Sequence, residues 1–188
     1  MKKGGGHQKG SNFERDMARK LSLWWTQDFE EPRDDIFWRT SGSGARATTR
    51  TKLQKKTAYE YGDIGFRDPI GKPLIDCMLI ECKKGYSKDV DILDLFHNEE
   101  KALLFLWWKK ALKEMESAGR KNCMLILARN RRSEVCFINK SFFEERSHIS
   151  GNFPGNRIEI FYANSLVVIK LEDFFEWIDP ETIKLDMI

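Results

Sequence analysis

Residues 61–83, YGDIGFRDPIGKPLIDCMLIECK, contain the pattern from which the fold can be inferred. The apolar runs at 61–66 and 74–83 predict two strands. The segment between them, residues 67–73, contains two prolines, a glycine and an aspartate, all of which favour turns. We therefore expect the two strands to be antiparallel neighbours in one sheet.

The second predicted strand ends in a charged pair, Glu81 and Lys83. Side chains alternate between the two faces of a strand, so this pair shares one face while Ile80 and Cys82 point into the other layer. Burying either charge alone would be costly. A salt bridge in solvent at the end of the strand is the ordinary explanation for an isolated E-x-K.

Asp63 follows Gly62 near the start of the first predicted strand. If the two strands form a hairpin, Asp63 can lie beside Glu81. Two adjacent carboxylates repel each other, and a divalent cation between them makes the arrangement favourable. The alternative is that Asp63 is only a turn residue after Gly62.

Before this region, the pattern predicts a helix from Ser11 to about Trp25. Ser11 can act as the N-cap and Glu14, three residues later, completes a capping box. Apolar residues then recur at helical spacing and give one buried face. Residues 1–10 are rich in Gly and Lys, and we expect a flexible basic arm.

The remainder of the chain alternates between strand and helix signals. We expect a strand at 36–39, a flexible loop at 40–56, a helix at about 91–118 ended by Gly119, strands at 123–128 and 134–138, a helix at 141–146, strands at 158–162 and 166–171, and a helix at 173–177. This order is a mixed α/β pattern. The 188 residues suit a single domain, 11–188, with a core at about 11–138 and a C-terminal elaboration at 139–188.

Composition excludes several classes of protein. The chain contains 13 Phe, 6 Trp and 4 Tyr, and a disordered chain lacks so many aromatic residues. No apolar run approaches the ~20 residues of a membrane span. The four cysteines form no C-x-x-C pair, so a zinc site is not expected and they are interpreted as small buried side chains. Without a signal peptide, we expect a reducing, cytoplasmic location.

The net charge of +3 is modest, but basic residues are concentrated in one segment. Between positions 39 and 56 there are six cations and no acid: Arg39, Arg46, Arg50, Lys52, Lys55 and Lys56. Such a segment can bind an anionic polymer. A solvated basic loop is the alternative.

Taken together, a helix Glu, a strand Asp and an E-x-K on the next strand resemble the PD-(D/E)xK nuclease superfamily. The corresponding residues are Glu14, Asp63, Glu81 and Lys83, with Gly62 where proline is common. The resemblance implies a restriction-endonuclease-like α/β fold, a mixed sheet flanked by helices.

Within that superfamily, the chain resembles archaeal-type and phage-encoded Holliday junction resolvases. The similar segments are KGSNFERD at 9–16, RTSGSG at 39–44 and the hairpin at 123–138 with its R-N-R-R turn. The segment between Ser43 and Asp63, the helix with Trp107 and Trp108, and the tail after about 153 exceed the resolvase core.

This resemblance implies a homodimeric, metal-dependent endonuclease acting on four-way or other branched DNA. Mg²⁺, or Mn²⁺ in its place, would be held by Asp63, Glu81 and the Cys82 carbonyl, with Glu14 directly or through water. Lys83 would orient the attacking water or stabilise charge on the phosphate. The residues expected to contact DNA are Arg15, Arg39, Ser41, Ser43, Arg46, Arg50, Lys52, Lys55 and Lys56.

Two other functions remain open on the sequence alone. The chain could be a nuclease of the same superfamily that acts on duplex or single-stranded DNA, or a non-catalytic DNA-binding module that keeps the fold. A phage-encoded protein would act in the host cytoplasm. Trp24, Trp25, Trp107 and Trp108 could stack on bases, but their helical spacing favours packing in a core or a dimer.

Overall fold

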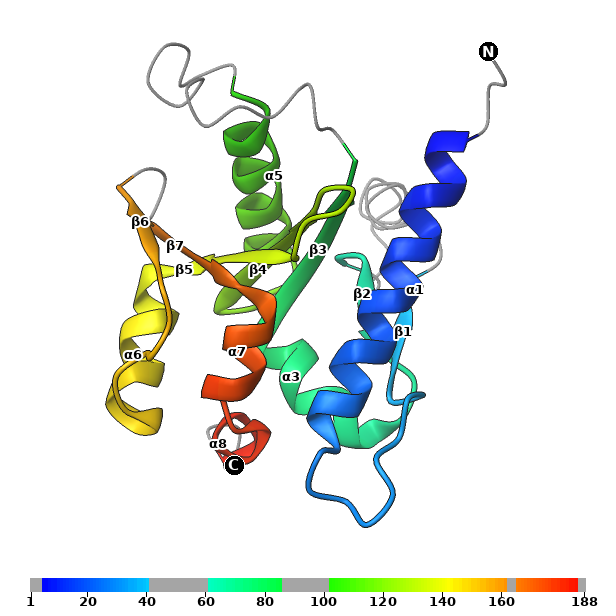
Figure 1. Ribbon diagram of the computed structural model, residues 1–188, viewed down its shortest axis with the longest axis vertical. Helices are drawn as coiled ribbons and strands as arrows, with labels where there is room; N and C mark the ends of the chain where they lie inside the picture. The colour runs from blue at the N-terminus through cyan, green and yellow to red at the C-terminus, as the bar shows by residue number, and fades with distance from the viewer. Residues whose placement is uncertain (1–4, 41–60, 86–101, 162–164, 186–188) are drawn as a thin grey trace.

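The computed structural model describes residues 5–40, 61–85, 102–161 and 165–185, with side chains from residue 10 onward (Figure 1). Their elements are, in chain order, α1 (Gly5–Trp25), β1 (Phe37–Arg39), β2 (Ile64–Phe66), a 3₁₀ turn (Pro69–Gly71), α3 (Lys72–Cys77), β3 (Met78–Lys84), α5 (Leu103–Ser117), β4 (Asn122–Ala128), β5 (Val135–Asn139), α6 (Lys140–Ser150), β6 (Ile158–Ile160), β7 (Leu166–Lys170), α7 (Leu171–Trp177) and α8 (Pro180–Leu185). The predicted loop at 40–56 and the first part of the helix predicted at 91–118 lie outside these residues, apart from Thr40.

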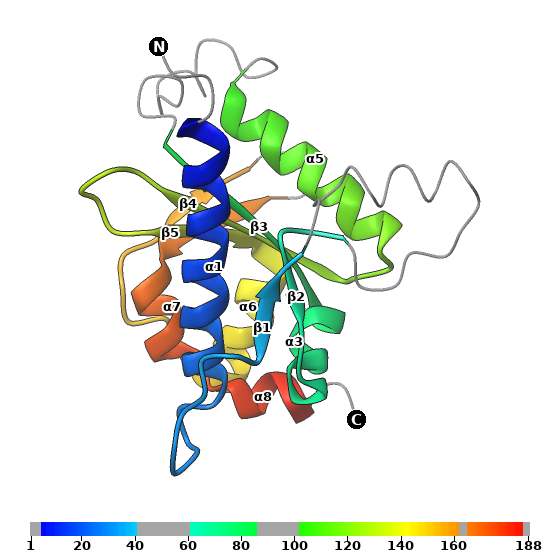
Figure 2. The same ribbon diagram turned by 90° about the vertical axis from the view of Figure 1, so that its right-hand side faces the viewer.

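A five-stranded mixed sheet forms the centre of the molecule, in the order β3-β4-β5-β7-β6. β3 and β4 are parallel, and the other neighbouring pairs are antiparallel. β1 and β2 form a separate antiparallel pair. Helices cover both faces of the large sheet (Figure 2). The predicted restriction-endonuclease-like α/β fold is confirmed.

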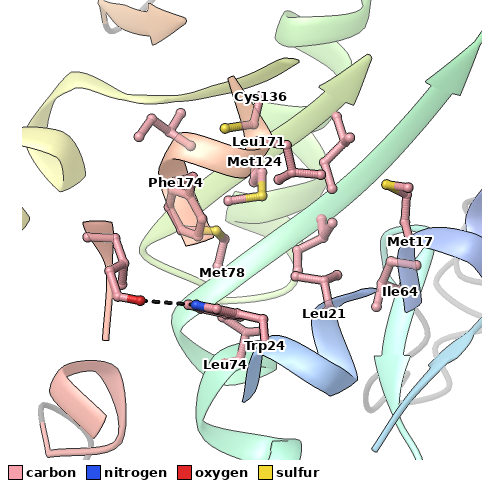
Figure 3. Close-up of a cluster of buried hydrophobic side chains, with 14 of the residues drawn as sticks. Met17, Leu21, Trp24, Ile64, Leu74, Met78, Met124, Cys136, Leu171 and Phe174 are labelled. Atoms are coloured by element: carbon pink, nitrogen blue, oxygen red, sulfur yellow. Dashed lines mark hydrogen bonds between the residues drawn. The ribbon is translucent and has the colours of Figure 1, made fainter. Parts of the chain in front are cut away.

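The two faces of the sheet carry two separate hydrophobic clusters, because the side chains of β3 alternate. Ile80 and Cys82 belong to the cluster that also contains α1, α7 and α8 residues, while Leu79 belongs to the cluster under α5. Figure 3 shows the first cluster, in which Trp24 donates its Nε1–H to the Ile178 carbonyl at 3.0 Å. The alternation predicted for 80–83 is therefore present.

The predicted hairpin of strands 61–66 and 74–83 is wrong. β2 pairs with β1, and the first part of the second predicted strand is the helix α3. Pro73 lies in the first turn of α3, where its missing N–H removes no helical hydrogen bond. A short apolar run such as 74–80 is compatible with either a helix or a strand, and here the helix ends where the buried strand β3 begins.

The start of the first helix also differs from the prediction. α1 begins at Gly5, so Ser11 is a buried residue inside the helix and not its N-cap. Residues 5–10 of the predicted basic arm are thus helical. Glycine disfavours a helix interior by only about 1 kcal/mol relative to alanine, so a helix can continue into a Gly-containing segment.

Other predictions for individual elements are confirmed. β4 and β5 form the predicted antiparallel pair, and α5 ends before Gly119, whose φ is +67°. Trp24, Trp25 and Trp108 are buried and Trp107 is partly buried, which supports the packing interpretation. All four cysteines are buried and free.

The C-terminal helix α8 was not predicted from the sequence. Across the described segments, no helix has the length and apolar character needed to cross a membrane.

Candidate active site

Three of the predicted catalytic side chains meet at the outer edge of β3. Asp63 and Glu81 are 3% and 4% exposed. The Nζ atom of Lys83 lies 2.7 Å from Glu81 Oε2 and 3.4 Å from Asp63 Oδ2. Two buried carboxylates therefore share one ammonium group, which excludes the solvent-exposed salt bridge that an isolated E-x-K would suggest.

Asp63 reaches this position through bonds to the unpaired edge of β3. Its backbone N–H donates to the Ile80 carbonyl at 2.8 Å, and its carboxylate accepts the backbone N–H of Cys82 at 2.8 Å. The carboxylate thus satisfies an edge N–H that no neighbouring strand reaches. Asp63 lies beside Glu81, as predicted, although the two strands do not form a hairpin.

The segment before Asp63 is fixed by Thr40 and Gly62. The Thr40 hydroxyl donates to the Gly62 carbonyl at 2.6 Å, and the Thr40 N–H donates to the Asp63 carbonyl at 3.0 Å. Gly62 has a φ of +77°, and a Cβ atom there would lie 2.9 Å from the Ile80 carbonyl oxygen. Proline, whose φ is near −65°, cannot adopt this conformation, so the glycine follows from the geometry.

Burial and like charge act together on Glu81. Burial, followed by the neighbouring charge of Asp63, raises the pKa of Glu81 to about 7, although Lys83 opposes the shift. For Lys83, burial alone would lower the pKa, but the charges of Glu81 and Asp63 outweigh it and raise the pKa above its ordinary value. With both carboxylates ionised, the cluster carries one excess negative charge in a buried place.

The donor set fits a hard divalent cation. The two carboxylates, together with the Cys82 carbonyl that accepts a hydrogen bond from Lys83 Nζ at 3.3 Å, offer the oxygen donors that Mg²⁺ and Mn²⁺ prefer. A cation there would offset the excess charge. In the part of the chain that the structure describes, no group of three or more His, Cys, Asp or Glu side chains is placed to hold a metal. The metal-binding roles of Asp63, Glu81 and the Cys82 carbonyl stay predictions.

Glu14 lies in α1 and forms an ion pair with Arg39 of β1. Both side chains are mostly buried. The structure thus joins two residues that the sequence assigned to different tasks, one to the metal and one to DNA. Arg15 donates a hydrogen bond to the Asn12 side chain at 2.9 Å. The metal-binding role of Glu14 and the DNA-binding roles of Arg15 and Arg39 stay predictions.

The remaining predicted DNA-binding residues lie outside the described residues: Ser41, Ser43, Arg46, Arg50, Lys52, Lys55 and Lys56. Conversely, the structure adds residues that the sequence did not indicate. Arg120 donates to the Tyr61 carbonyl at 3.4 Å, two residues before Asp63. The charge of Glu114 on α5 adds to the raised pKa of Glu81, after the larger effects of burial and Asp63. No local motif marks either residue, because both approach from a distant element.

A model of the protein family described as "Phage putative PDDEXK endonuclease" matches residues 5–185. The match covers the helix with Glu14, the three clustered side chains and the C-terminal elements. No curated protein matches the chain, and no solved structure does.

Proposed function

Because the chain belongs to this family of phage PDDEXK endonucleases, we propose that it is a divalent-metal-dependent endodeoxyribonuclease that cuts branched DNA, with four-way junctions as the favoured substrate. The observation that carries the proposal is the buried cluster of Asp63, Glu81 and Lys83. A protein that only bound DNA would have no evident use for two buried carboxylates sharing one ammonium group, since such a cluster is costly to bury.

In the proposed reaction, Asp63, Glu81 and the Cys82 carbonyl hold Mg²⁺ or Mn²⁺, and Glu14 contributes directly or through water. When bound, the metal supplies a Lewis acid for the phosphate and for water. Lys83 keeps its proton at neutral pH because its pKa is raised. It therefore acts as a hydrogen-bond donor that orients the attacking water or stabilises charge on the phosphate, and not as a general base.

The choice of branched DNA rests on the similarity of residues 9–16 and 39–44 to resolvase segments. A resolvase must nick two strands symmetrically, and a two-fold homodimer is the natural arrangement for that task. A phage protein of this kind would act in the host cytoplasm. The second candidate is an endonuclease for linear duplex or single-stranded DNA, which the same cluster would also serve.

A side-by-side cleavage assay tests the proposal. Purified protein is incubated with a four-way junction, a linear duplex and a single strand of the same sequence, with Mg²⁺, Mn²⁺ or a chelator. We expect metal-dependent cleavage, fastest on the junction. Glu81→Gln should lose about a thousandfold or more in rate, since a metal contributes several kcal/mol to the transition state, while DNA binding remains.

The matched control is Glu116→Gln, which removes the same charge from an exposed position on α5. This variant should cleave like the parent protein. Equal or faster cleavage of the linear duplex would favour the second candidate. Absence of cleavage of all three DNAs with either metal would contradict the enzymatic function.

A further inference from the structure

The turn between β4 and β5 presents a group of arginines that the cluster at β3 does not use. Residues 129–132 read Arg-Asn-Arg-Arg, and we refer to them as the arginine turn. Arg131 and Arg132 are exposed, whereas Arg129 is half-buried. Within the described ranges, no ion pair involves the side chains of Arg131 or Arg132. Their charges are therefore available to an anionic ligand.

The strand register places this turn just beyond the carboxyl end of β3, whereas Glu81 lies near the middle of that strand. β3 and β4 are parallel, with Glu81 opposite Leu125 and Lys84 opposite Ala128. The Gly85 N–H also donates to the Ala128 carbonyl at 3.1 Å. Arg129 follows directly, so the turn begins about 13 Å along the strand from the level of Glu81.

The start of β5 ties the arginine turn to the first helix. The Nζ atom of Lys20 in α1 lies 2.8 Å from Oε1 of Glu134, which precedes β5. Figures 1 and 2 both show the β4–β5 turn near α1. Lys84, at the end of β3, places its Nζ 5.1 Å from the centre of the Phe13 ring on the same helix. The turn and the helix that carries Glu14 thus border one surface.

The nearby acid does not cancel the positive charge of this surface. The pKa of Glu134 is lowered: burial opposes the shift, but the hydrogen bond from Lys20 and the charges of Lys20 and Lys84 outweigh it. Glu134 is thus ionised and already paired with Lys20. The exposed arginines next to it keep an unbalanced charge of the sign that phosphate requires.

We propose that the arginine turn, together with Lys84, binds the phosphate backbone of the substrate several nucleotides from the cut. The proposal rests on the proposed nuclease function and adds a contact surface to it. Duplex DNA carries one negative charge per ~1.7 Å of axis, so the distance of about 13 Å along the strand between the level of Glu81 and the turn corresponds to several phosphate charges. At that separation the arginines contribute to affinity and not to the rate of bond cleavage.

The backbone of the turn allows its charge to be removed with little disturbance. Arg131 has a φ of +61°, a left-handed conformation in which asparagine is more favourable than arginine. The double variant Arg131→Asn/Arg132→Gln therefore removes two charges while keeping a residue suited to the turn. Arg131→Lys/Arg132→Lys keeps both charges. Lys113→Ala/Lys121→Ala removes two exposed charges from α5 and the residue before β4, away from the turn.

The experiment measures the affinity of each variant for a labelled duplex and a labelled four-way junction across a salt series. All proteins carry Glu81→Gln, so that no DNA is cut during titration. If both arginines contact phosphates, the Asn/Gln variant should bind more weakly, with a slope of log K against log salt shallower by about 1.8. The lysine variant and the Lys113/Lys121 control should keep the slope of the Glu81→Gln protein.

An unchanged slope in the Asn/Gln variant would overturn the inference, as would an equal loss in the Lys113/Lys121 control. DNA binding that depends on the arginines, combined with no cleavage by the parent protein, would contradict the proposed nuclease function and support the surface. Cleavage by the parent protein, combined with an unchanged slope in the Asn/Gln variant, would support the nuclease function and contradict the proposed DNA contact of the arginine turn. A parent protein that does not bind DNA would contradict both.

Discussion

Glu81 and Lys83 illustrate how much of the chemistry is decided at single residues. Their separation by one position on β3 places the two charged groups 2.7 Å apart on one face. Neither group would be stable there alone, because an unpaired buried charge is costly. Ionised Asp63 adds one negative charge to this neutral pair. That excess negative charge is the physical basis of the expected metal binding.

The raised pKa of Glu81 predicts an unusual dependence of stability on pH in metal-free protein. The folded state holds this proton up to about pH 7, while the unfolded chain releases it near 4.5. Folded protein therefore binds more protons in this window, and the free energy of unfolding should fall as pH rises from about 5 to 7. The decrease is at most about 1.4 kcal/mol per pH unit.

Chemical denaturation at several pH values, with a chelator present, measures this dependence. Asp68 and Glu134 have lowered pKa values, so the stability they contribute is lost only at more acidic pH, outside the window. Glu81→Gln should abolish the decrease. A decrease of the same size in Glu81→Gln would show that another group causes it.

Lys83→Ala should reduce turnover by about a hundredfold or more, a larger effect than its effect on metal affinity. Removing the ammonium also leaves the carboxylates without their counter-charge, so the pKa of Glu81 should rise further. Metal affinity measured by calorimetry at pH 8.5 should therefore approach that of the parent protein, while the cleavage rate should not. If the metal affinity and the cleavage rate of Lys83→Ala both return to the parent values at pH 8.5, Lys83 serves only to keep the carboxylates ionised.

At the level of elements, the site depends on a contact between β2 and β3 that is not a regular strand pair. The chain entering β2 approaches the edge of β3 closely at Gly62, and two hydrogen bonds from the Asp63 region hold it there. The connection through the 3₁₀ turn and α3 separates the two strands in sequence without separating the carboxylates in space.

Gly62→Ala should disrupt this contact. The variant must accept a φ of +77° and a Cβ atom 2.9 Å from the Ile80 carbonyl oxygen. We expect a loss of about 1–3 kcal/mol in stability and a clear loss of cleavage, because Asp63 moves with the backbone. Thermal unfolding and cleavage assays measure the two effects.

Gly119→Ala is the matched control for this variant. Gly119 has a φ of +67°, but a Cβ atom added there would meet nothing within 4 Å, so the substitution adds only the conformational cost. That cost is about 1–2 kcal/mol. The variant should lose stability modestly and keep the cleavage rate of the parent protein. Equal loss of cleavage in both glycine variants would indicate a general effect of destabilisation.

At the scale of the whole molecule, the parallel pairing of β3 and β4 organises the functional surface. A parallel pair needs a crossover, and the described part of that crossover is α5, which covers the face on which Leu79 lies. The crossover also brings the ends of β3 and β4 to the same edge. The arginine turn therefore begins directly after the level at which β3 ends, although it is far from the carboxylates in sequence.

The basic segment 39–56 provides a separate prediction for DNA affinity. Arg46→Ala/Arg50→Ala/Lys52→Ala should make the salt dependence of DNA binding shallower by about 0.9 for each phosphate that these side chains bind in the parent protein. At low salt and high protein concentration this triple variant should still cleave, because the carboxylates are unchanged. Binding titrations across a salt series measure the slope. An unchanged slope would mean that this segment is only solvated.

Local sequence patterns were enough to predict that Asp63, Glu81 and Lys83 lie together, and to predict much of the element order. The E-x-K spacing, the strand Asp63 and the helix Glu14 are local patterns, and strand alternation alone puts Glu81 and Lys83 on one face. The hairpin at β4–β5 and the end of α5 just before Gly119 likewise follow from short-range turn signals. These features need no knowledge of distant contacts.

The assembly of the site depends on long-range packing that no local pattern predicts. Residues 74–77 form a helix that buries Leu74, Ile75 and Cys77. α1 starts at Gly5 because a capping signal of four residues does not prevent a helix from extending past it. The pairing of Glu14 with Arg39, and the position of Glu114 near Glu81, depend on elements that are distant in sequence. Burial by those elements converts an ordinary carboxylate into one with a raised pKa, since desolvation is a property of the packed fold and not of the residue.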